Sequence, residues 1–157
     1  MFFGTYAHTL DDTGRLTIPS KLRDAIAASS AADAASADAT APKLPCIFLT
    51  CGAEKCIIAY TAPRVAQIID EMKRDRVNAG EVREFKRTFG GEGAMESWDK
   101  QGRILLPEGL KAFAGITKDV TIVGAVDCFE IWDTAAFKAR RDATRSAYDL
   151  IAGKVIT

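Results

Sequence analysis

This chain of 157 residues is poor in the residues that build catalytic and metal sites. It has a single histidine, His8, and neither the Gly-x-x-x-x-Gly-Lys phosphate loop nor the His-Glu-x-x-His zinc pattern. Its four cysteines, at positions 46, 51, 56 and 128, lack the Cys-x-x-Cys spacing that is typical of zinc sites. The adjacent carboxylates Asp11 and Asp12 fit a turn better than an acid–base pair. We therefore expect no enzyme activity, no small-molecule substrate, no cofactor and no metal site. The cysteines are interpreted as reduced structural thiols, with metal binding as the alternative.

The chain also lacks a net charge and long hydrophobic runs. Its 21 basic residues balance 21 acidic ones, and the pI is about 6.6, so no overall field attracts nucleic acid, although one face can still be basic. No stretch reaches the roughly 20 apolar residues that a membrane span needs. The start, Met1-Phe2-Phe3-Gly4, has no basic segment of the kind that begins a signal peptide. These features predict a cytoplasmic globular protein with no membrane partner.

What the sequence does contain is one stretch written twice. Asp11-Asp12-Thr13-Gly14-Arg15-Leu16-Thr17-Ile18-Pro19 matches Asp99-Lys100-Gln101-Gly102-Arg103-Ile104-Leu105-Leu106-Pro107. The shared pattern is Asp-x-x-Gly-Arg-aliphatic-x-aliphatic-Pro, and the two copies are 88 positions apart. A match of this length indicates an internal duplication.

Each copy predicts two short strands joined by a tight turn and followed by a helix. Asp11 and Asp99 begin the turns, where a carboxylate can accept hydrogen bonds from backbone N–H groups. Gly14 and Gly102 end the turns, where glycine adopts a positive φ without steric cost. The proline then ends the strand, because it has no N–H group to donate.

The rest of the chain repeats the same order in each half: a second hairpin, then a longer helix. The hairpins are expected at residues 46–60 and 120–132, and the helices at 20–26, 62–76, 82–89 and 137–150. The two hairpins are 72 rather than 88 positions apart, and the difference equals the length of the Ala/Ser-rich segment 27–42, which is interpreted as an inserted surface excursion. We expect an α+β fold with a first half at residues 1–76, a linker with a helical segment at 77–93, and a second half at 94–157. Large apolar residues such as Phe2, Phe3 and Trp98 are candidates for subunit contacts, with burial inside the monomer as the alternative.

Basic residues beside the two turns suggest a binding surface. Arg15 and Arg103 occupy equivalent positions, and four lysines and arginines stand close by: Lys21, Arg23, Lys100 and Lys111. An Asp–Arg ion pair that holds each turn is the simpler interpretation, but an exposed pair contributes only roughly 0–1 kcal/mol. The planar guanidinium fork suits phosphates and guanine edges, which favours contact with double-stranded DNA.

These motifs resemble the MraZ family of bacterial transcriptional regulators. The resemblance rests on Met1-Phe2-x-Gly4, the doubled turn, Trp132-Asp133 after the last strand and the order of elements, and it covers nearly the whole chain. It implies tandem AbrB-like swapped-hairpin β-barrel halves in one pseudo-symmetric domain. It also implies a nucleoid-associated homo-oligomeric ring that binds repeated promoter sites and represses its own division and cell-wall gene cluster. Thr13 and Gln101 depart from the lysine that often precedes the first glycine, which should weaken phosphate contact. A ring without DNA, with both arginines in subunit contacts, is the alternative.

Overall fold

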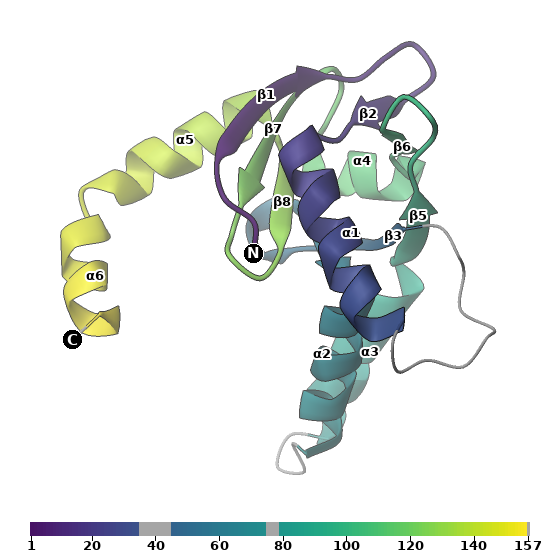
Figure 1. Ribbon diagram of the computed structural model, residues 1–157. Coiled ribbons are helices and arrows are strands. Elements are labelled where there is room, and N and C mark those ends of the chain that lie inside the picture. Colours follow the sequence, from purple (N-terminus) through teal and green to yellow (C-terminus); the bar gives the residue numbers. More distant parts are fainter. Residues whose placement is uncertain (35–44, 75–78, 157) are drawn as a thin grey trace.

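The computed structural model describes residues 1–34, 45–74 and 79–156, and the same order of elements occurs twice within them (Figure 1). The first half contains the strands β1 (Thr5–Thr9), β2 (Arg15–Thr17), β3 (Cys46–Cys51) and β4 (Ile57–Thr61). The second half contains the strands β5 (Ala94–Ser97), β6 (Arg103–Leu105), β7 (Asp119–Gly124) and β8 (Phe129–Asp133). The helices are α1 (Ser20–Ala34), α2 (Ala62–Arg74), α3 (Ala79–Gly91), α4 (Glu108–Ala114), α5 (Thr134–Arg145) and α6 (Tyr148–Val155). The mixed α and β content predicted from the sequence is confirmed.

Strand pairing joins the two halves into one unit. Six strands form an antiparallel sheet in the order β1-β7-β8-β4-β3-β5, so the first strand of each half pairs with the second hairpin of the other half. The remaining strands, β2 and β6, form a ribbon in which Leu16 lies opposite Ile104. These two residues are themselves 88 positions apart, so the ribbon lies on the pseudo-twofold axis that relates the halves.

Two helices predicted from the sequence are corrected by the fold. The helix predicted at 20–26 continues to Ala34, so residues 27–34 of the supposed insert belong to α1; alanine has the highest helix propensity, and this run is rich in it. The remainder of that segment, 35–42, lies outside the described residues. The single helix predicted at 137–150 is two helices, α5 and α6, separated at Ser146–Ala147.

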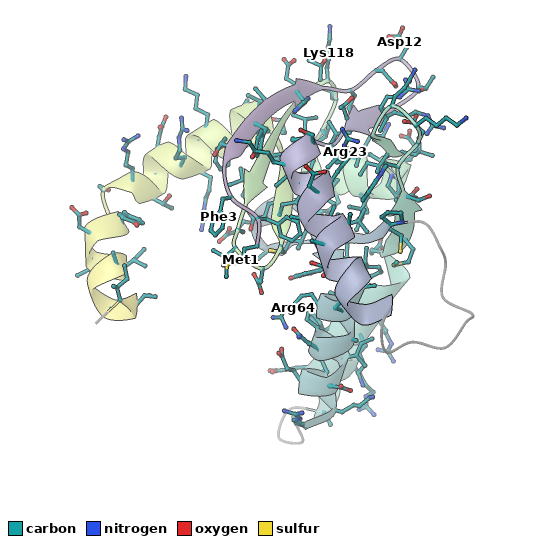
Figure 2. All side chains as sticks on the ribbon, in the orientation of Figure 1. Met1, Phe3, Asp12, Arg23, Arg64 and Lys118 are labelled. Carbon is teal, nitrogen blue, oxygen red and sulfur yellow. The ribbon has the colours of Figure 1, made fainter. Side chains whose placement is uncertain are left out.

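For the aromatic residues at the start of the chain, the sequence left subunit contact and burial inside the monomer open, and Phe2 is buried. Phe2 is only 3% exposed, packs its ring against Phe129 and exchanges two backbone hydrogen bonds with Val126. It is therefore a core residue and not a candidate for subunit contact. Phe3 remains exposed (Figure 2), and Trp98 packs partly buried against the core.

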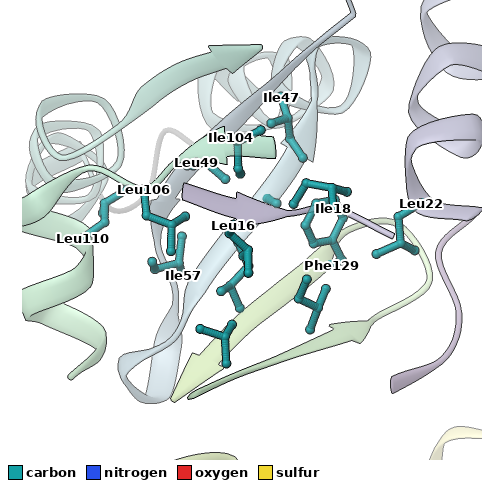
Figure 3. Packing of buried hydrophobic residues seen from close by; sticks show 14 of the residues in the cluster. Leu16, Ile18, Leu22, Ile47, Leu49, Ile57, Ile104, Leu106, Leu110 and Phe129 are labelled. Atoms are coloured by element: carbon teal, nitrogen blue, oxygen red, sulfur yellow. The ribbon is translucent and has the colours of Figure 1, made fainter. Parts of the chain in front are cut away.

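The core lies between the ribbon and the six-stranded sheet and draws on both halves (Figure 3). Leu16 and Ile18 of the first half and Ile104 of the second half are fully buried beside Phe129. Burying one such side chain contributes roughly 1.5–3 kcal/mol, and the contributing atoms come from segments far apart in sequence. Neither half could therefore bury its own ribbon strand alone.

None of the helices in the described ranges is long and apolar enough to cross a membrane.

Candidate nucleic-acid interface

The first turn, Asp11–Arg15, is organised by the Asp11 side chain. Its Oδ1 accepts hydrogen bonds from the backbone N–H of Thr13 and of Arg15, both at 2.9 Å, and from the Thr13 hydroxyl at 2.7 Å. Gly14 closes the turn with φ of +76° and donates its N–H to the Asp11 carbonyl. The Thr13 hydroxyl, followed by the Arg15 N–H, lowers the pKa of Asp11 because these bonds favour the charged carboxylate.

The second turn, Asp99–Arg103, repeats this geometry. Asp99 Oδ1 accepts from the backbone N–H of Gln101 at 2.9 Å and of Arg103 at 3.0 Å, and Gly102 has φ of +77°. The Arg103 N–H, above all, lowers the pKa of Asp99. Both carboxylates are therefore held in their charged form by the turn itself.

The two turn arginines differ in their partners. Arg103 places Nε 2.9 Å from Asp99 Oδ2 and Nη1 3.1 Å from Asp11 Oδ2, so it links its own turn to the other one. Arg15 has no ion pair within residues 1–34, 45–74 and 79–156. Its charge acts on Glu96, whose pKa burial raises and Arg15 lowers in part. The Asp–Arg pair considered from the sequence thus exists for Asp99 and Arg103, whereas Asp11 pairs with the distant Arg103.

Each turn is also covered by a basic side chain from the other half. A Cβ atom built on Gly102 would lie 2.7 Å from Arg23 Cζ, and one built on Gly14 would lie 3.1 Å from Lys111 Nζ. The backbone follows the same exchange: Ile18 donates to the Gly102 carbonyl at 2.9 Å, and Leu106 donates to the Gly14 carbonyl at 3.2 Å. Both turns therefore lie side by side at one end of the molecule (Figure 1).

The six basic residues singled out from the sequence are not equally accessible. Lys21 and Lys100 are exposed, whereas Arg15, Arg23 and Arg103 are half-buried. The Lys111 side chain is only 15% exposed and its ammonium group pairs with Glu108 at 2.6 Å. The exposed lysines and Arg15 are thus the cations best placed to meet a large anionic partner.

Sequence reasoning missed Lys118. It lines a hollow of about 330 Å³ beside the first turn, together with Asp11, Asp12 and Lys111. Figure 2 shows Lys118 and Asp12 at the same end of the molecule. The sequence pattern did not indicate Lys118 because this residue follows α4 in a connection that has no counterpart in the repeated motif.

Within the described residues no group of three or more His, Cys, Asp or Glu side chains could hold a metal ion. Burial raises the pKa of the Cys56 thiol to about 12 and that of Cys128 to about 11, so both stay protonated near neutral pH.

Comparison with known proteins agrees with the repeated architecture. The family model of the MraZ protein, which its description likens to antitoxins, matches residues 1–88 and again residues 89–147. Each match contains one Asp-x-x-Gly-Arg turn. The chain belongs to the MraZ family. The helix α6 lies beyond the second match of the MraZ model.

Relatives cover almost the full length. A protein of Kocuria rhizophila is 30% identical over 99% of this chain and 97% of its own length. A protein of Lactobacillus delbrueckii subsp. bulgaricus is 37% identical over 97% of this chain and 94% of its own length. A protein of Micrococcus luteus is 31% identical over 95% of this chain and 94% of its own length. All three bear the name "Transcriptional regulator MraZ".

Proposed function

We propose that this protein is a sequence-specific DNA-binding transcriptional regulator whose two turns contact double-stranded DNA. The observation that carries the proposal is the pairing of both turns at one end of the molecule, with the Arg15 guanidinium free of ion pairs in the described part of the chain. A guanidinium fork matches the O6 and N7 acceptors of guanine in the major groove. The names of the relatives support the same function.

The exchanged strand pairing supports a finer description of the fold. Each half contributes its first hairpin to the other half, as expected for AbrB-like swapped-hairpin halves fused in one chain. In this proposal the carboxylates and glycines of the turns hold the backbone, and the six basic side chains contact DNA or support those that do: Arg15, Arg103, Lys21, Arg23, Lys100 and Lys111.

Assembly into a ring would compensate for weak binding by one subunit. A chain with no net charge neutralises few phosphates, so one subunit alone binds DNA weakly. Several subunits on successive repeats gain from effective concentration. Exposed apolar residues on α6, Leu150 and Ile151 among them, support self-association, because an eight-residue helix is marginal in water alone. The target would be repeated sites at the promoter of its own division and cell-wall gene cluster, with repression in the cytoplasm at the nucleoid.

The test is fluorescence anisotropy with a labelled duplex taken from directly upstream of the chain's own gene, at several salt concentrations. Arg15→Ala should weaken binding about 5- to 150-fold, because one bidentate contact contributes roughly 1–3 kcal/mol. Arg83→Ala is the matched control, since Arg83 is exposed on α3 and outside the turns. Light scattering should show an unchanged oligomer for both variants. Loss of the oligomer in Arg15→Ala, with no DNA binding by the native protein, would favour the ring without DNA.

A further inference from the structure

The two turns carry opposite charges at equivalent positions. Asp12 and Lys100 are 88 positions apart, each follows the turn-forming aspartate, and both are exposed. Among the residues that the structure describes, no hydrogen bond or ion pair involves the Asp12 carboxylate. The two turns therefore share their backbone geometry but differ in side-chain charge at their tips.

The exchange of elements between the halves enlarges this difference. Because α1 lies beside the second turn, that side combines four cations with two carboxylates, a net charge of +2: Lys21, Arg23, Lys100, Arg103, Asp24 and Asp99. Because α4 lies beside the first turn, that side combines three cations with three carboxylates, a net charge of zero: Arg15, Lys111, Lys118, Asp11, Asp12 and Glu108. One side attracts phosphate and the other does not.

The turn arginines add a second asymmetry. Arg103 is held by two carboxylates, Asp99 and Asp11, so its fork is occupied and its role is to position the first turn against the second. Arg15 forms no ion pair among the described residues, although its charge acts on Glu96, so its guanidinium can still bind an outside partner. Near DNA, an unpaired carboxylate such as Asp12 is repelled by phosphates, and its favourable partner is a base amino group, as when Asp accepts from cytosine N4.

We propose that each subunit binds DNA in one fixed orientation, with the second turn on the phosphate backbone and the first turn on base edges. Lys100 and Lys21 hold phosphates, Arg15 and Asp12 read bases, and Asp12 selects a cytosine. The proposal rests on the DNA-binding function proposed above. It predicts that substitutions at the tips of the two turns impair DNA binding in different ways, although the turns are related by duplication.

The experiment compares Lys100→Ala with Asp12→Ala on the upstream duplex and on duplexes with single base-pair substitutions. Lys100→Ala should reduce the slope of log K against log salt by about 0.9 for each engaged subunit and weaken all sequences alike. Asp12→Ala should leave the slope unchanged and lose about tenfold discrimination at one C·G position. Both side chains are exposed, so both variants should fold.

A charge-exchanged control separates position from total charge. The double variant Asp12→Lys with Lys100→Asp keeps the net charge at zero and should lose both phosphate and base contacts. Native-like binding by this variant would overturn the proposal, as would tighter binding of Asp12→Ala to all sequences with a steeper salt slope. If the native protein binds no duplex even at low salt, the DNA-binding function itself fails.

Discussion

The clearest quantitative consequence of the exchanged architecture concerns the two turn glycines. Gly14 and Gly102 have nearly the same φ, +76° and +77°, so replacement by alanine carries the same backbone cost, roughly 1–2 kcal/mol for an L-residue in the left-handed region. Their surroundings differ. At Gly14 a new methyl group would lie 3.1 Å from the Lys111 ammonium, whereas at Gly102 it would lie 2.7 Å from Arg23 Cζ and overlap the guanidinium.

Arg23 cannot move without a further loss. Its Nε donates to the Ile18 carbonyl at 3.0 Å, and a hydrogen bond to a charged group contributes about 1.5–3 kcal/mol. We therefore expect Gly14→Ala to lower the free energy of unfolding by about 1–2 kcal/mol and Gly102→Ala by about 2.5–5 kcal/mol. Urea unfolding at one fixed protein concentration measures both, because association also stabilises the folded state.

The double-mutant cycle with Arg23→Ala decides whether this reasoning is right. Without the Arg23 side chain, Gly102→Ala should cost no more than Gly14→Ala, since only the backbone cost remains. Gly115→Ala is a control for the backbone cost alone, because Gly115 has φ of +64° and no described atom lies within 4 Å of its Cβ position. Equal losses at Gly14 and Gly102 in the native background would refute the exchanged packing of α1 on the second turn.

Three further measurements follow from the structure. The pKa of Asp11 and of Asp99 lies below the ordinary value of 3.8 in the folded protein, so these groups stabilise the fold above that pH and the contribution is lost as the pH falls through the folded pKa; Asp99→Asn should flatten the acid limb of a stability–pH profile. Cys56 and Cys128 should resist iodoacetamide at pH 8 until urea unfolds the chain, as mass spectrometry can show, and rapid native labelling would contradict their burial. Leu150→Asp with Ile151→Asp should reduce the oligomer size in light scattering without changing the circular dichroism of the subunit, and an unchanged size would exclude α6 as a contact.

Much of the local structure was predictable because local contacts decide it. The turns need only a carboxylate that accepts nearby N–H groups and a glycine that tolerates a positive φ, and both are visible in Asp-x-x-Gly-Arg. The hairpins and most helices follow from alternation and helical spacing. The errors lie where the pattern is weak: the alanine-rich extension of α1, and the break between α5 and α6 that no glycine or proline marks.

The sequence by itself determined that the protein is duplicated, that each copy has a turn with an arginine, and that Asp12 and Lys100 break the symmetry. Only the tertiary structure decided that β1 pairs with β7, that Arg23 covers the opposite turn, and that Arg103 bridges both turns while Arg15 does not. The physical reason is the range of the interactions. A turn is closed by atoms within four residues, whereas the partner of a strand edge or of a guanidinium is chosen by a fold that brings together groups roughly 80 to 120 positions apart.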